Sequence, residues 1–387
     1  MTDSITSKTK TEQHINNPTT MLIPLKLIPR AEPSFKMQII VPFIVVILTL
    51  LAGLAIFMTL GVDPQTAFKA YFIDPLSTLY GVSEWLLKAL PLCLIGLGLA
   101  VAYRAQVWNI GAEGQLVMGG IFATATMVYA QNAITSGWLV CLMILAGILG
   151  GMVWAGLAAW MRTKFNANEI LTTLMLVYVA QSILQYLLVG TVDNTAPLQD
   201  PMGAGFPQSQ MFPVNATLPL LGSMIPALSS TRLHIGILLL LIIVPLMWVF
   251  AKRSFTGFQM TVAGLAPKAA NYAGFKTNRL IWLALLISGG LAGLAGALEV
   301  AGPVGQLQES WRPGYGFTAI IVAFLGRLHP VGVLIGALLM ALLTLGGEAL
   351  QISMSLPQSV SLLFQGLLLM FLLSADVLVN YRVVWRR

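Results

Sequence analysis

The amino-acid sequence predicts an all-α protein that crosses a membrane about ten times. Of its 387 residues, 57% are hydrophobic and only 9% are charged, and the mean hydropathy is +0.84. A soluble globular chain carries about 25% charged residues, so this chain lacks the side chains that a water-facing surface needs. The composition therefore excludes a soluble enzyme, a soluble nucleic-acid-binding protein and a disordered chain.

Apolar runs long enough to cross a bilayer occur along most of the chain. A crossing needs about 20 apolar residues, and the sequence predicts ten spans, near residues 38–60, 85–102, 116–130, 137–161, 170–189, 234–251, 280–301, 316–326, 331–346 and 360–378. The first run is longer than the apolar core of a cleavable signal peptide. We interpret it as an uncleaved signal anchor that follows a polar tail, residues 1–37.

Two of these runs, 116–130 and 316–326, are short for a full crossing and lie beside glycine-rich stretches. Such segments are typical of the broken or re-entrant helices of transporters. A glycine-rich polar turn, a short span, a glycine-spaced span and an apolar span with a polar start occur at 109–189 and recur at 312–378. Because the two sets enter the membrane from opposite sides, they predict an inverted repeat.

Pairs of glycines four residues apart predict tight packing between the spans. This spacing places both glycines on one face of a helix, where a neighbouring backbone can approach closely. The pairs are Gly147 with Gly151, Gly289 with Gly293, and Gly332 with Gly336.

The distribution of basic residues predicts the orientation. If the N-terminus is cytoplasmic, 17 of the 21 Lys and Arg residues fall on the cytoplasmic side, as the positive-inside rule requires. We expect a membrane domain at 38–378, a cytoplasmic C-terminal tail at 379–387, a long outer loop at 190–233 and a basic cytoplasmic loop at 252–279. The excess of basic residues is then a topology signal, and we expect no nucleic-acid partner.

The chain carries no signature of an enzyme or of a bound cofactor. Cys93 and Cys141 lie in apolar runs, and His14, His234 and His329 are too far apart in sequence for metal-ligand spacing. No Lys follows a Gly, so the end of a phosphate-binding P-loop is absent. We expect no metal and no cofactor on this chain, and any ATP must be hydrolysed by another chain.

Three acidic residues are candidates for a function at membrane depth: Glu113, Glu299 and Asp376. A charge at membrane depth costs about 2.5–3.5 kcal/mol on insertion scales, so each calls for an explanation. We expect Asp376 to pair with Arg382. Glu299 is either solvated, paired with a lysine or a solute contact, and Glu113 either caps a helix start or contacts a polar solute.

Several ordered motifs make the chain resemble a known family. The stretch Asn109–Gln115 (NIGAEGQ) resembles the signature of permease subunits of bacterial ABC importers for nucleosides and simple sugars, within the group that includes ribose and branched-chain amino acid permeases. Asn168–Ile170, Ala263–Gly274, Ser288–Ala297 and Gly314–Phe317 match in the same order. The resemblance covers the chain from about residue 40 to the end.

The resemblance implies a type II ABC importer-like fold in the bacterial inner membrane. Two permeases, by resemblance a heterodimer, would enclose one pathway, an external lipoprotein would deliver the solute, and ATP-Mg would bind to separate ATPase subunits. The cytoplasmic motif that docks on the ATPase is matched by five residues: Pro267, Lys268, Ala269, Ala270 and Gly274. Lys268 stands where that motif often has Glu.

For solute contact we expect Asn109, Glu113 and Gln115, joined by Glu299 and Gln306 from the second half. Amide and carboxylate groups suit the hydroxyls of a ribose or a hexose. Three aromatic residues are further candidates for stacking, or for anchoring and packing: Trp108, Trp311 and Tyr315.

A proton-coupled secondary transporter is the alternative, with Glu113 or Glu299 carrying the proton. An intramembrane enzyme is a weaker third reading, because no nucleophile, base or metal-ligand set is present.

Overall fold

The computed structural model describes residues 25–29, 35–134, 136–190, 196–203, 205–311 and 313–385. Within these residues, eight helices are long and apolar enough to cross a membrane. The long helices are α1 (Phe35–Thr59), α3 (Leu79–Arg104), α5 (Trp138–Phe165), α6 (Glu169–Leu188), α7 (Leu238–Arg253), α10 (Thr277–Glu299), α12 (Pro330–Met354) and α13 (Ser359–Asn380). Together with the shorter α4 (Ala112–Ala130) and α11 (Tyr315–Leu325), they coincide with the ten predicted spans.

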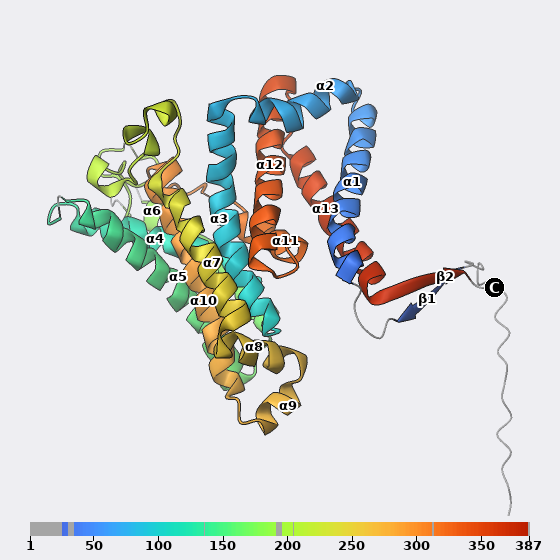
Figure 1. The fold of residues 1–387 in the computed structure, drawn as a ribbon. Helices are drawn as coiled ribbons and strands as arrows, with labels where there is room; N and C mark the ends of the chain where they lie inside the picture. The colour runs from blue at the N-terminus through green and yellow to red at the C-terminus, as the bar shows by residue number, and fades with distance from the viewer. Residues whose placement is uncertain are drawn as a thin grey trace, which may run out of the picture.

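Of the two helices predicted to be broken or re-entrant, α11 is too short for a crossing, whereas α4 is one continuous helix. α11 is an 11-residue apolar helix, and the 19-residue α4 begins with the polar residues Glu113 and Gln115. The sets α3–α6 and α10–α13 share one order, in which a long helix is followed by a short one and then by two long ones. In Figure 1, α3 starts from the end where α2 (Pro64–Phe68) lies, whereas α10 starts from the end beside α9 (Pro267–Tyr272). The sets therefore run in opposite directions, as expected for an inverted repeat.

The helices α3 and α12 are longer than the apolar runs that predict them. Each continues past a glutamate that is paired with a basic residue. α12 continues eight residues beyond the predicted end at 346, and its Glu348 accepts a 2.8 Å hydrogen bond from Lys88 of α3. α3 begins six residues before 85, and its Glu84 is held by two hydrogen bonds from Arg232, at 2.9 and 2.5 Å. The Glu84 carboxylate raises the pKa of Arg232, which lies in the outer loop.

Glycine contacts hold α4, α5 and α10 together. A Cβ atom on Gly151 would lie 2.1 Å from the carbonyl oxygen of Gly289, and one on Gly293 would lie 2.2 Å from that of Gly147. Real Cβ atoms essentially never come this close, so only glycine permits these crossings. The third predicted pair also lies at a contact, because a Cβ atom on Gly332 would lie 2.3 Å from the carbonyl oxygen of Gly326. The predicted role of the glycine pairs in packing is confirmed.

The connections predicted to lie outside and in the cytoplasm contain short helices. The outer loop forms the 3₁₀ turns Val214–Ala216, Leu221–Ser223 and Pro226–Leu228, and Ile235–Ile237 leads into α7. A π-helical segment, Val300–Val304, ends α10, and the outer loop packs on it through the hydrogen bond from Leu218 N to Ala301 O, 2.8 Å. A second π-helical segment, Lys69–Ile73, and the 3₁₀ turn Asp74–Leu76 join α2 to α3. On the opposite end of the bundle, α8 (Phe255–Leu265) and α9 form the loop between α7 and α10 (Figure 1).

The ends of the described chain form a small antiparallel sheet that the sequence analysis did not predict. Strand β1 (Leu25–Pro29) pairs with β2 (Tyr381–Trp385), with Leu25 opposite Trp385. This pairing brings the two chain ends to one side of the bundle. Most of the predicted N-terminal tail and the side chain of Asp376 lie outside the described residues, so the pair of Asp376 with Arg382 stays a prediction.

Candidate functional site

The turn between α3 and α4 is organised by two facing amides. Asn109 donates from Nδ2 to Gln115 Oε1 at 2.8 Å, and Gln115 donates from Nε2 to Asn109 Oδ1 at 3.0 Å. The same Asn109 Oδ1 accepts from the backbone N–H of Gly111 at 3.1 Å. Asn109 and Gln115 are 0% and 2% exposed. The two amide side chains of the NIGAEGQ motif thus satisfy each other inside the protein, which reduces the penalty of burying them.

This turn is also tied to the neighbouring helices. Asn109 Nδ2 donates to Ser288 Oγ of α10 at 2.9 Å, and Ile110 N donates to Thr173 Oγ1 of α6 at 3.2 Å. A Cβ atom on Gly111 would lie 2.4 Å from the carbonyl oxygen of Thr173. The motif therefore fixes the position at which the backbone turns back into the membrane.

Glu113 joins the starts of the two short helices. It lies in the first turn of α4, and its two carboxylate oxygens accept hydrogen bonds from Gly314 N at 2.9 Å and Gly316 N at 2.7 Å. Gly314 and Gly316 lie at the start of α11, 201 and 203 residues further along the chain. A helix N-terminus carries a partial positive charge and unsatisfied N–H groups. The Glu113 carboxylate therefore lies at the positive end of α4 and accepts hydrogen bonds from two N–H groups at the start of α11.

Glycine is required on the α11 side of this contact. A Cβ atom on Gly316 would lie 2.2 Å from Glu113 N, and Gly314 has a φ of +70°, in the left-handed region that favours glycine. We call the contact of Glu113 with Gly314 and Gly316 the Glu113 clasp.

A cavity of about 470 Å³ lies beside the clasp, between α11, α12 and α13. Gly314, Tyr315 and Phe317 of the clasped segment line it. Its polar groups come from all three helices, and Gln365 of α13 links two of them, through 3.4 Å to Thr318 of α11 and 3.3 Å to Thr344 of α12. Among the residues that the structure describes, those lining the cavity carry no charged side chain; Arg312, which precedes the lining residue Pro313, lies outside the described residues. The structure thus offers uncharged hydrogen-bonding groups and two aromatic rings around one space.

At the end of the bundle predicted to be cytoplasmic, α8 and α9 lie below the long helices in Figure 1. Pro267 begins α9, Ala270 is fully buried against the bundle, and Lys268 and Ala269 are exposed. Tyr272, the last residue of α9, is 98% exposed. Gly274 follows with a φ of +78°, which closes the turn towards α10. Four of the predicted coupling residues thus lie in one short helix, and Gly274 follows it. The buried Ala270 anchors this helix, while Lys268 and Ala269 face outward.

The sequence matches the model of a protein family described as the branched-chain amino acid transport system / permease component, over residues 81–373. This chain belongs to that permease family.

Three individual permeases are similar to this chain over most of its length. The glucose ABC transporter permease TsgB13 of Haloferax volcanii is 35% identical over 94% of this chain and 94% of its own length. The guanosine ABC transporter permease NupP of Bacillus subtilis is 29% identical over 87% of this chain and 94% of its own. A second Haloferax volcanii relative, the putative glucose permease TsgC13, is 29% identical over 67% of this chain and 73% of its own. No solved structure matches the chain significantly.

As a member of this permease family, the chain is the membrane-spanning permease subunit of an ABC transporter, a transport component rather than an enzyme. The proton-coupled alternative is not favoured, because the relatives are ABC permeases.

The structure separates the predicted solute contacts of this permease into two groups. Asn109, Glu113 and Gln115 lie together at the meeting of the short helices, each at most 2% exposed. Glu299 is half-buried at the end of α10, beside the Tyr315 side chain and near Lys88. Gln306 lies in the following segment and reaches Gln208 of the outer loop at 3.5 Å. Solute contact by any of these residues stays a prediction.

The three candidate aromatic residues also have different places in the permease. Trp108 packs between Tyr103 and Phe324, with ring centroids 5.2 and 6.1 Å away. Trp311 is 8% exposed and covers Gly120. Tyr315 alone of the three lines the cavity.

The sequence analysis missed the polar residues of the cavity, chiefly Thr318, Thr344 and Gln365. A signal was present, because Gln365 stands in an otherwise apolar span. It carries no charge, however, and a search for costly groups at membrane depth passes over a neutral amide.

Proposed function

We propose that this chain forms one half of the pathway of an ATP-driven importer for a nucleoside or a simple sugar. The observation that carries the proposal is the cavity beside α11, α12 and α13, in which Gln365, Thr318 and Thr344 place uncharged polar groups within a mostly apolar lining. Its volume falls within the range of about 300–1,000 Å³ that small-molecule sites occupy. The relatives named for glucose and guanosine support the same solute class.

The chemistry of the cavity suits a neutral solute with many hydroxyls. The Gln365 amide and the Thr318 and Thr344 hydroxyls can each donate and accept. Tyr315 and Phe317 supply faces on which a base or a sugar ring can stack. These uncharged donors and acceptors suit a neutral solute such as a nucleoside or a sugar.

In this proposal Glu113 is a positioning residue. Both of its carboxylate oxygens are engaged by the start of α11, so it fixes the segment that carries Tyr315 and Phe317. Asn109 and Gln115 fix the start of α4 in the same way. Glu299 and Gln306 lie towards the outer loop, where a solute delivered from outside would arrive.

We propose that a second, different permease supplies the opposite wall of the pathway. Two different permeases named for glucose in Haloferax volcanii are both similar to this chain, which supports a heterodimer. An external substrate-binding lipoprotein would deliver the solute.

We propose that α9 docks on an ATPase subunit that holds ATP-Mg. The exposed Lys268, Ala269 and Tyr272 form its outer surface, while the buried Ala270 and the turn at Gly274 attach it to α8 and α10. A movement of the ATPase would then shift α9 as a rigid body and switch the pathway between its two open states. This places α8, α9 and both chain ends on the cytoplasmic side of the bacterial inner membrane.

Copurification followed by transport measurements tests the proposal. A tag on this chain should recover an ATPase and a second permease, and proteoliposomes of that complex with its binding protein should take up guanosine or glucose only with ATP inside. Gln365→Leu should reduce uptake strongly, whereas Gln351→Leu, at an exposed position of α12, should leave it unchanged. Tyr272→Ala should lower recovery of the ATPase. Uptake that survives ATP depletion and collapses with the proton gradient would overturn the proposal.

A further inference from the structure

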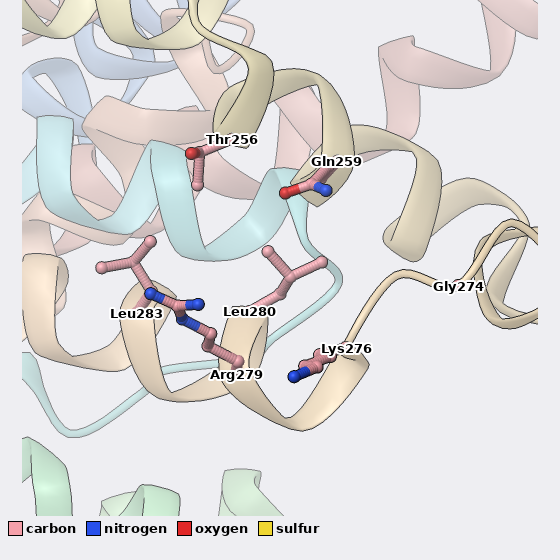
Figure 2. A pocket seen from close by; sticks show the side chains of 7 residues that line it. All are labelled: Thr256, Gln259, Gly274, Lys276, Arg279, Leu280 and Leu283. Atoms are coloured by element: carbon pink, nitrogen blue, oxygen red, sulfur yellow. The ribbon is translucent and has the colours of Figure 1, made fainter.

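A second cavity, of about 340 Å³, lies at the cytoplasmic end between α8 and the start of α10. Figure 2 shows Thr256 and Gln259 on α8 facing the beginning of α10, which carries Arg279, with Lys276 just before its first residue. Leu280 and Leu283, one turn further into α10, line the same space. The cavity thus has a cationic and polar rim and an apolar inner wall.

The cations of this cavity have no acidic partner nearby in sequence. The chain contains no Asp or Glu between Asp200 and Glu299. Lys276 and Arg279 are exposed, and neither belongs to one of the three ion pairs found in the part of the chain that the structure describes. They also stand at the N-terminal end of a 23-residue helix, whose dipole adds to their positive potential. An anion in the cavity would relieve this accumulation of like charge.

The position of the cavity points to the membrane surface as the source of the anion. The span that contains α10 begins at Thr277, directly after Lys276. Leu280 and Leu283 therefore lie where the apolar part of the bilayer begins, and Lys276 and Arg279 lie at the depth of the lipid headgroups. On α8, Phe255 and Phe258 are 66% and 56% exposed beside the polar Thr256 and Gln259. Exposed aromatic rings next to polar groups are typical of a segment in the membrane interface.

We propose that this cavity binds the phosphate group of an anionic phospholipid from the cytoplasmic leaflet. Lys276 and Arg279 pair with the phosphate, Thr256 and Gln259 donate hydrogen bonds to it, and the first methylenes of the acyl chains lie on Leu280 and Leu283. Because α8 leads directly into α9, a lipid in this position also holds the α8–α9 loop against the start of α10.

Binding of fluorescent phosphatidylglycerol to the purified complex in neutral detergent tests the proposal. Unlabelled phosphatidylglycerol should compete, whereas phosphatidylcholine and millimolar inorganic phosphate should compete weakly. The double variant Lys276→Gln/Arg279→Gln should bind roughly 30-fold more weakly, since each cation near an anionic lipid surface contributes about 1 kcal/mol. Lys276→Arg should bind normally, because it keeps the charge.

The matched control is Lys252→Gln/Arg253→Gln, which removes two exposed cations from the end of α7 and lies outside the cavity lining. It should bind the lipid nearly as the unchanged complex does. Equal loss of binding in the two double variants would show only a general attraction to the basic surface and would overturn the proposal. Unchanged binding in Lys276→Gln/Arg279→Gln would also overturn it, and so would full competition by inorganic phosphate, which would assign the site to a soluble anion. An unchanged elution volume and unchanged recovery of the partner subunits show that each variant is folded.

Discussion

The permease contains a tightly packed region and a loosely packed one. In the first, α4, α5 and α10 touch through glycines, and a Cβ atom on Gly151, Gly293 or Gly296 would lie within 2.2 Å of a carbonyl oxygen of a neighbouring helix. In the second, a cavity of about 470 Å³ is lined mainly by α11 and α13, with Thr344 of α12, and a Cβ atom on Gly366 of α13 would meet nothing within 4 Å. Away from this cavity α11 and α12 also meet closely, at Gly326 and Gly332.

This difference indicates that the glycine-packed region is a rigid scaffold and that the region around the cavity carries the solute pathway. Helices in backbone contact cannot slide or separate without losing many close contacts at once. Helices around a cavity can change their spacing at smaller cost. The Glu113 clasp joins the two regions, because Glu113 belongs to α4 and its partners Gly314 and Gly316 belong to α11.

The largest expected effect is that of a methyl group in the tight region. Gly151→Ala should destabilise the complex by about 1–3 kcal/mol or more, as overpacking does, because the new Cβ would lie 2.1 Å from Gly289 O. Gly156→Ala, five residues further along α5, meets only Trp282 and Leu286 at 3.6 and 3.8 Å. Thermal unfolding followed by size-exclusion chromatography should show a lower transition temperature for the first variant alone. Equal transition temperatures would show that the two faces of α5 are packed alike.

A large side chain in the loosely packed region should impair uptake without lowering the stability of the complex. Gly366→Leu should fill the cavity and abolish uptake, while the transition temperature and the recovery of partner subunits stay unchanged. Normal uptake by a folded Gly366→Leu complex would contradict the assignment of the pathway to α11–α13.

Weakening the clasp should impair transport more than folding. Glu113→Ala leaves the buried N–H of Gly316 and the partly buried N–H of Gly314 without their acceptor, at about 1–3 kcal/mol for a buried group, and should abolish uptake. Glu113→Gln keeps one carbonyl acceptor and should retain part of the uptake. If the alanine variant transported normally, the clasp would have no role in holding the wall of the cavity.

The smallest expected effect concerns the link between α3 and α12. The ion pair of Lys88 with Glu348 is partly exposed, with side-chain exposures of 18% and 38%, and Glu348→Gln should cost less than about 1 kcal/mol. Glu84→Gln should cost more, because Glu84 is 8% exposed and is held by two hydrogen bonds from Arg232. The order of the two transition temperatures checks this prediction.

Much of the fold follows from local sequence patterns. Apolar runs predict the ten helices, the shortness of 316–326 predicts the short α11, and the glycine spacing predicts the close crossings of α5 with α10. The short run 116–130 belongs to a longer, continuous helix, α4. Helix ends are less well predicted where a charged residue is paired with a residue distant in sequence, as Glu348 is with Lys88. The pairing of β1 with β2 joins residues more than 350 positions apart, and no local sequence pattern predicts it.

The site is predictable only in its parts. The NIGAEGQ motif marks a special helix start, yet the partners of Glu113 lie two hundred residues away, and nothing in the motif distinguishes a clasp from a solute contact. The cavity is made by three helices whose polar residues are single and uncharged, so it becomes visible only when α11, α12 and α13 are placed together.

Thiol labelling at Gln365 tests most directly whether solute passes through the loose region. With Cys93 and Cys141 replaced by alanine, Gln365→Cys in the complete importer should react with a small soluble thiol reagent. A saturating concentration of the transported solute should slow that reaction, while Gln351→Cys should react at the same rate with and without solute. If the solute left the labelling of Gln365→Cys unchanged while transport continued, the pathway would lie elsewhere in the molecule.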